Sequence, residues 1–126
     1  MPKRIIQTNN APKSLAGYSQ AVEAGGFIFV SGQGPFDPVT GAKVGESIQE
    51  QTRQCLRNIE AILTEAGSSL AQVVSATFIL GEESDFGGMN EEWGRWFPTD
   101  PPARQGAKLP IHPQGMKISI AVIAEA

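Results

Sequence analysis

The chain has 126 residues and a formal net charge of −3, and its 40% hydrophobic and 18% charged shares exclude a disordered or collagen-like protein. This length predicts a single domain over 1–126, and the acidic balance makes nucleic acid and anionic membranes poor partners. No apolar run approaches the roughly 20 residues that span a bilayer, and no signal-type apolar core follows the first residues. We therefore expect a cytoplasmic protein that binds neither nucleic acid nor a membrane.

The chain contains one cysteine, Cys55, and one histidine, His112. These two residues can form neither an internal disulfide nor a structural zinc site, so we expect no metal. A serine or cysteine nucleophile would need His112 as its base, but His112 lies between two prolines in a segment typical of a loop. We therefore interpret Cys55 as core packing and expect water to be the nucleophile of any reaction.

The first part of the chain is typical of strands joined by tight turns. Residues 5–7 and 20–24 alternate weakly in polarity, and two glycines separate the second segment from an apolar run over 27–30. That arrangement predicts a β-hairpin. Prolines and glycines over 35–41 predict a loop that no regular element crosses.

The strongest helical pattern covers residues 47–66, where apolar side chains recur at steps of three and four. Ser47, with Glu50 three residues later, fits a capping box at the start of this helix. Gly67 fits the glycine that commonly follows a helix end. The pattern therefore predicts both ends of the helix as well as its apolar face.

A second helix is expected over 84–97, with Ser84 as its cap, although its three glycines require tertiary packing to hold it. Residues 73–80 and 117–124 are rich in β-branched side chains and predict strands, with a less regular segment over 104–109. The order β-β-α-β-α-β-β predicts an α+β fold with both helices on one face of a mixed sheet. Because the other sheet face is then partly apolar and uncovered, we expect a homo-oligomer.

Three short motifs stand in the order and at about the spacing found in a known family. They are Gly17-Tyr18-Ser19-Gln20-Ala21, Ser31-Gly32-Gln33 and Pro101-Pro102-Ala103-Arg104. Together with the helical segment 51–59, the turn 66–70 and Asn90, they resemble the reactive intermediate deaminase family, the RidA or YjgF group, also called L-PSP endoribonucleases. The resemblance covers nearly the whole chain.

This resemblance implies a chorismate-mutase-like α+β fold and a homotrimer whose sheets form a central barrel. It also implies active-site clefts between adjacent subunits. The implied activity is hydrolysis of 2-imino acids, or of their 2-aminoacrylate tautomers, to 2-oxo acids and ammonia without a cofactor. The partner would then be a small carboxylate-bearing imine, enamine or 2-oxo acid.

The resemblance also implies roles for individual residues. Arg104 would bind the substrate carboxylate, since a guanidinium fork matches a carboxylate bidentately and keeps its charge. The alternative is a surface arginine paired with an acidic residue. Tyr18 would line the cleft opposite Arg104 of the neighbouring subunit, or would be a core aromatic with its hydroxyl at the rim.

Four further residues complete the implied site. Ser31 and Gly32 would follow a strand directly and contact the substrate, although an ordinary Ser-Gly strand exit explains them equally well. Asn90 on the second helix joins them as a substrate-binding residue. Gly106 stands where the family often has cysteine, and its backbone would position the attacking water.

Ser119 departs from the family because many deaminases carry a glutamate at this position, which is believed to activate the water. A serine can hydrogen-bond water but cannot take its proton at neutral pH, and the loss could lower the rate 10²–10⁴-fold. Gln105 and the pair Ala16-Gly17 also depart from the family pattern. Two readings stay open beside the deaminase: a non-catalytic trimer that binds small carboxylates, and a ribonuclease, which the acidic charge disfavours.

Overall fold

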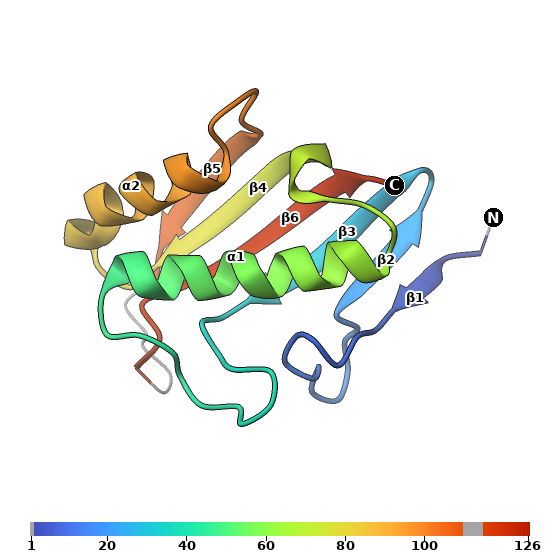
Figure 1. Ribbon diagram of the computed structural model, residues 1–126, viewed down its shortest axis with the longest axis horizontal. Coiled ribbons are helices and arrows are strands. Elements are labelled where there is room, and N and C mark those ends of the chain that lie inside the picture. Colours follow the sequence, from blue (N-terminus) through green and yellow to red (C-terminus); the bar gives the residue numbers. More distant parts are fainter. Residues whose placement is uncertain (1, 110–114) are drawn as a thin grey trace.

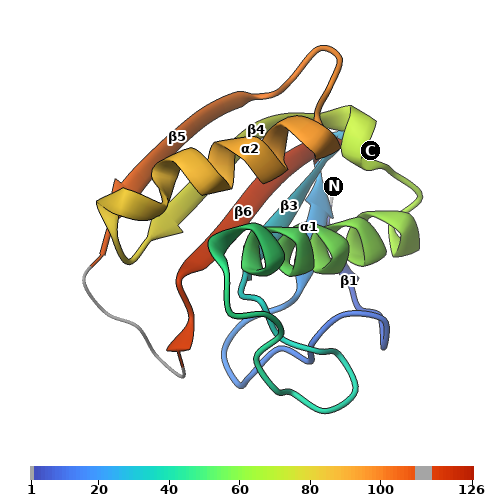
Figure 2. The same cartoon turned by 60° about the vertical axis from the view of Figure 1, so that its left-hand side comes forward.

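Six strands form one mixed sheet, and two helices cover one of its faces (Figures 1 and 2). The computed structural model describes residues 2–109 and 115–126, so His112 lies outside the described residues. The strand order is β1-β2-β3-β6-β4-β5, and only the pair β4 and β5 is parallel. The strands are β1 (Arg4–Ile6), β2 (Ala21–Ala24), β3 (Phe27–Gln33), β4 (Val73–Leu80), β5 (Ala103–Lys108) and β6 (Ile118–Glu125). The predicted α+β class and the placement of the helices are confirmed.

Helix α1 (Ile48–Glu65) has both of its predicted ends. The Ser47 side chain accepts a hydrogen bond from the backbone of Glu50, whose carboxylate accepts one from the Ser47 backbone in return. Gly67 has a φ of +83°, and the amide of Ser68 donates to the Leu63 carbonyl over 2.8 Å. This closure satisfies carbonyl groups that would otherwise lack partners at the helix end.

Helix α2 (Phe86–Trp96) confirms the second predicted helix, but Ser84 does not cap it. A 3₁₀ turn, η2 (Glu83–Asp85), leads into the helix, and the first helical amide donates to the Glu83 carbonyl instead. The residue at the cap position, Asp85, makes no side-chain capping hydrogen bond. The helix is held by packing, since Met89 is fully buried and Trp93 is 5% exposed.

A partly buried ion pair joins the two helices. The Arg53 guanidinium donates two hydrogen bonds of 3.1 Å to the Glu92 carboxylate, and Trp96 Nε1 donates a third over 2.9 Å. The Glu92 side chain is only 2% exposed. These donors, Arg53 first, hold the pKa of Glu92 below its ordinary value despite burial. The pair fixes α2 against α1 and thereby the position of Trp93.

The hairpin between β2 and β3 turns at Gly25 and Gly26, whose φ angles are +60° and +84°. Two positive φ angles fit the tight turn that the sequence predicts. Strand β3 continues to Gln33, so Ser31 and Gly32 lie inside the strand rather than after it. The register against β6 shifts between Val30 and Gln33, and this irregularity gives the strand a local bend. The predicted loop over 35–41 is confirmed.

The two sheet faces differ in their cover. Side chains alternate along each strand, so Ile28 and Ile120 lie under the helices with at most 1% exposure. Phe29 points the other way, is 45% exposed and pairs with Ile123 across β3 and β6. Phe27 and Ile79 are further large apolar side chains exposed on this face. Within the described residues the face has no covering layer, as the sequence predicts (Figure 2).

Candidate functional site

A cavity of about 630 Å³ opens between two loops near the start of β6 and the end of β3. It brings together three of the residues that the sequence singles out, namely Tyr18, Gly32 and Ser119. Other side chains in its wall include Lys13, Leu15, Phe36, Asp37, Val39 and Met116. The wall is therefore mixed, with apolar side chains around a few polar groups, as small-molecule sites commonly are.

The loop that carries Tyr18 is held by a buried glutamine. Gln20 is 2% exposed, and its amide donates to the carbonyls of Thr8 and Pro12 over 3.1 and 2.8 Å. Its carbonyl accepts from the Thr8 amide over 2.7 Å. Tyr18 itself is 48% exposed at the mouth of the cavity. Gln20 belongs to the first motif, and its burial explains why a glutamine stands there.

Ser31 fixes the same loop from the other side. Its hydroxyl donates a 2.6 Å hydrogen bond to the Ser19 carbonyl, and its amide donates to the Gln20 carbonyl over 2.9 Å. The hydroxyl hydrogen is thus used within the protein, while the oxygen lone pairs can still accept. A Cβ added to Gly32 would meet no atom within 4 Å. Within one protomer, crowding does not require a glycine at position 32.

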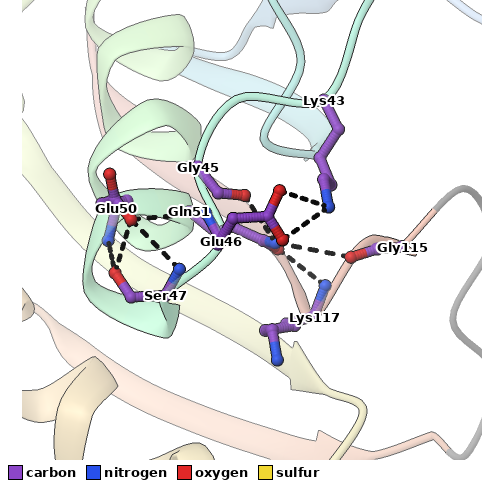
Figure 3. A network of polar contacts seen from close by, with 8 residues as sticks. All are labelled: Lys43, Gly45, Glu46, Ser47, Glu50, Gln51, Gly115 and Lys117. Carbon is purple, nitrogen blue, oxygen red and sulfur yellow. Dashed lines mark hydrogen bonds and ion pairs between the residues drawn. The ribbon is translucent and has the colours of Figure 1, made fainter.

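Three polar side chains on α1 hold the remaining loops of the cavity. Gln51 is fully buried, donates to the carbonyls of Gly45 and Gly115, and accepts from the Lys117 amide over 2.8 Å (Figure 3). Asn58 donates to two carbonyls in the loop that follows β3, and Gln54 donates to one of them. These residues lie beside the apolar stripe of the helix. Amide side chains that border an apolar stripe are the sequence signal that could have identified this role.

Ser119 lies on the uncovered side of the sheet. Its neighbours Ile118 and Ile120 are buried toward the helices, so alternation directs Ser119 away from them and into the wall of the cavity. Among the described residues, the only carboxylate in that wall belongs to Asp37. It accepts hydrogen bonds from the amides of Thr40 and Val39, and these bonds, that from Thr40 first, hold its pKa below the ordinary value. A carboxylate stabilised in this way is a weak base.

Arg104 lies on the other side of the molecule's sheet, on edge strand β5. Its guanidinium carbon is 5.1 Å from the centre of the Phe78 ring, 5.2 Å from Trp93 and 5.8 Å from Phe86. Within residues 2–109 and 115–126, no hydrogen bond or ion pair engages its side chain, and the residue is exposed. The arginine therefore stacks on rings and keeps its N–H edge open to a ligand.

Gly106 follows Arg104 by two residues and pairs with Phe78 in the parallel ladder. A Cβ at this position would lie 2.1 Å from the tip of the Phe78 ring, closer than any real contact. Asn90 is half-buried on α2, three residues before Trp93. The predicted site residues thus fall into separate groups in one protomer: Tyr18, Ser31, Gly32 and Ser119 lie near the cavity, Arg104 and Gly106 lie on edge strand β5, and Asn90 lies on α2.

The family model described as Endoribonuclease L-PSP matches residues 8–126. The chain belongs to this family. Over 122 residues it is 45% identical to a RutC family protein of Pyrococcus horikoshii, and the match covers 97% of both chains. It is 37% identical over 122 residues to the 2-iminobutanoate/2-iminopropanoate deaminase of Rattus norvegicus, covering 97% of this chain and 89% of that protein. The resemblance to the RidA or YjgF group is thereby confirmed.

The fold of this L-PSP family member is shared with solved structures. The crystal structure of E. coli TdcF with bound serine aligns with a TM-score of 0.91 at 32% identity, covering 98% of each chain. In this family member the described helices include none long and apolar enough to cross a membrane. The functional residues that the sequence did not single out are Phe78, Phe86 and Trp93, whose rings surround the Arg104 guanidinium.

Proposed function

We propose that this protein hydrolyses small 2-imino acids, and their 2-aminoacrylate-type tautomers, to 2-oxo acids and ammonia without a cofactor. In this reaction a water oxygen adds to C2 of the imine and one water proton passes to the nitrogen, which gives a carbinolamine. The proton of the new C2 hydroxyl then passes to the same nitrogen as the C–N bond breaks, so that ammonia leaves and the C2 carbonyl forms. The name of the Rattus norvegicus relative as a deaminase of such imines supports this substrate class.

The observation that carries the proposal is that the Arg104 guanidinium lies against three aromatic rings and has no hydrogen-bond or ion-pair partner among the described residues. A guanidinium with its face on rings and its N–H edge open suits bidentate binding of one carboxylate. A 2-imino acid, a 2-oxo acid and an amino acid all carry a carboxylate next to the reacting carbon. Serine, the ligand named for the related TdcF structure, belongs to the same chemical group.

The site would lie between subunits of a homotrimer whose sheets form a central barrel. Arg104 stacks on the helix side of the sheet, whereas Ser119 points to the uncovered side, so one protomer cannot close both around a three-carbon acid. A neighbouring copy could supply the missing half and present Tyr18 opposite Arg104. The exposed apolar face around Phe29 gives such an assembly a surface to bury.

Catalysis in this arrangement relies on position more than on a base. Ser119 would hydrogen-bond the attacking water, Gly106 would contribute its backbone, and Ser31, Gly32 and Asn90 would contact the substrate. An imine is already electrophilic, especially when protonated, so bound orientation alone accelerates its hydrolysis. We therefore propose a slow deaminase compared with relatives that carry a glutamate at the position of Ser119.

A second candidate function is binding of small carboxylates without catalysis. The cavity wall favours it, since its only described carboxylate, Asp37, has a lowered pKa and two backbone partners. Because the net charge is −3, both candidates take a small molecule rather than RNA as the ligand.

The deciding experiment generates 2-iminopropanoate in situ with an amino-acid oxidase and follows pyruvate formation with and without the protein. Acceleration above the spontaneous rate that disappears in Arg104→Ala supports the deaminase. No acceleration, together with pyruvate binding in a calorimetric titration, supports the binding protein. If neither acceleration nor binding is observed, both candidates are wrong.

A further inference from the structure

We propose that Phe78, Phe86 and Trp93 form an aromatic shelf that positions the Arg104 guanidinium, and that Gly106 is required because it leaves room for the Phe78 ring. The inference rests on the proposed function, in which Arg104 binds the substrate carboxylate. It adds three residues that position Arg104. It also explains why residue 106 is a glycine, since a side chain there would displace the Phe78 ring.

The shelf is assembled from two elements that meet at the sheet edge. Phe78 comes from β4, while Phe86 and Trp93 come from the first and third turns of α2. The Phe78 and Phe86 ring centres are 5.9 Å apart with planes tilted by 40°. All three ring centres lie within 5.8 Å of the Arg104 guanidinium carbon. This spacing falls within the range of favourable cation–π contact.

Within the described residues, no carboxylate forms an ion pair with Arg104. Glu83, just before α2, pairs with Lys108 of β5 at 3.2 Å. An acidic partner would occupy the N–H edge of the guanidinium and would have to be displaced by substrate. Rings attract the cation through its face and leave the N–H groups free. The shelf thus holds the arginine without consuming the donors that a carboxylate needs.

Gly106 makes the shelf sterically possible. In the parallel ladder it stands directly beside Phe78, and an added Cβ would lie 2.1 to 2.5 Å from three atoms of that ring. Any side chain at 106 therefore forces the ring to move. Since Arg104 stacks on the same ring, the displacement passes to the guanidinium. The glycine at this position and the stacked arginine are two parts of one arrangement.

The first test reads the stacking directly in the ligand-free protein by NMR. Ring currents should shift the Arg104 Hδ resonances upfield in the wild type. Phe86→Leu keeps an apolar side chain but removes a ring, and should move these resonances back toward ordinary values, whereas Phe86→Tyr should not. Phe86 is 44% exposed, so neither change disturbs the core. Unshifted wild-type resonances would overturn the shelf.

The second test measures the dissociation constant for pyruvate by calorimetry, on variants shown by light scattering to keep the wild-type mass. Phe86→Leu should raise it about two- to fivefold, the size of one cation–π contact, and Phe86→Tyr should restore it. Gly106→Ala should raise it at least about tenfold, because a displaced Phe78 removes more than one contact. Gly94→Ala is the matched control, since a Cβ there meets nothing within 4 Å.

The outcomes separate the shelf from the proposed function. Loss of binding in Arg104→Ala, with wild-type affinity in Phe86→Leu and Gly106→Ala, keeps the carboxylate anchor and overturns the shelf. Wild-type affinity in Arg104→Ala would show that Arg104 does not bind the carboxylate. In that case the Arg104 Hδ resonances of the ligand-free protein still show whether the rings hold the guanidinium. Graded losses in Phe86→Leu and Gly106→Ala, with rescue by Phe86→Tyr, support both.

Discussion

The Ser31 hydroxyl donates a 2.6 Å hydrogen bond to the Ser19 carbonyl and thereby ties the Tyr18 loop to strand β3. A motif residue expected to touch the ligand is therefore also part of the scaffold that shapes the cavity. The same holds for Gln20, whose amide fixes the segment on the other side of Tyr18. The first two motifs of the sequence meet through these contacts.

Ser31→Ala should loosen the Tyr18 loop without unfolding the protein. Loss of one hydrogen bond of this kind costs about 1 kcal/mol, and the Ser19 carbonyl can accept a hydrogen bond from water instead. We expect faster amide exchange over 17–20 and a pyruvate dissociation constant raised about fivefold. Ser84→Ala is the matched control, because that serine is exposed and its side chain makes no hydrogen bond within the described structure. Equal amide exchange over 17–20 in both variants would show that the Ser31–Ser19 hydrogen bond does not hold the Tyr18 loop.

The uncovered sheet face should mediate assembly. Light scattering at micromolar protein is expected to give about three times the 13.4 kDa chain mass. Phe29→Glu places a charge on the 45% exposed apolar face and should lower the mass toward that of the monomer. Thr64→Glu, on the exposed side of α1, should leave the mass unchanged. A monomeric wild type would remove the basis of the two-subunit site.

Arg104 should determine carboxylate affinity. Arg104→Ala is expected to weaken pyruvate binding about 10- to 100-fold, the range of a hydrogen-bonded charged group. Arg104→Lys should recover only part of the affinity, because a point charge replaces a planar fork. Calorimetric titration of the three proteins measures this, and equal affinities would show that the carboxylate binds elsewhere.

The Arg53–Glu92 pair should make stability depend on acid. The folded-state pKa of Glu92 lies below its unfolded value, so its contribution is fully present above the ordinary carboxyl pKa of about 4.3. That contribution is lost as the pH falls through the lower, folded-state pKa. Urea unfolding should therefore show a larger drop in stability between pH 6 and acid for the wild type than for Glu92→Gln. Parallel curves for the two proteins would refute this linkage.

Local signals in the sequence predicted much of the fold. Ser47, Glu50 and Gly67 act through contacts within a few residues of themselves, so the ends of α1 are readable from spacing alone. The prediction that Ser84 caps the second helix was wrong, because the helix begins after a 3₁₀ turn whose backbone hydrogen bonds replace a side-chain cap. The end of β3 was also missed, since its pairing with β6, more than 80 residues away, extends the strand through Ser31.

The candidate site was less predictable for the same physical reason. Family motifs pointed to Arg104 and Tyr18, but no local pattern places Phe78, Phe86 and Trp93 around one guanidinium. That cluster depends on the register of β4 with β5 and on the position of α2. The Arg53–Glu92 pair helps to fix the position of α2 against α1. Sequence alone also gave no sign that Arg104 and Ser119 point to opposite sides of the sheet.

Ser119 offers the sharpest kinetic prediction. If the missing base limits turnover, Ser119→Glu should accelerate 2-iminopropanoate hydrolysis, up to the 10²–10⁴-fold range of general-base catalysis. A base acts in the transition state, whereas the carboxylate anchor acts in ground and transition states alike, so pyruvate affinity should change little. Because the side chain at 119 faces the cavity and not the core, a glutamate fits without disturbing Ile118 or Ile120.

The matched control for this prediction is Ser119→Gln, because glutamine has the size of glutamate but carries no basic carboxylate. Equal rates for the Glu and Gln variants would show that the base is not limiting, while an inactive wild type that gains activity only with Glu would favour a binding protein that lost catalysis at this position.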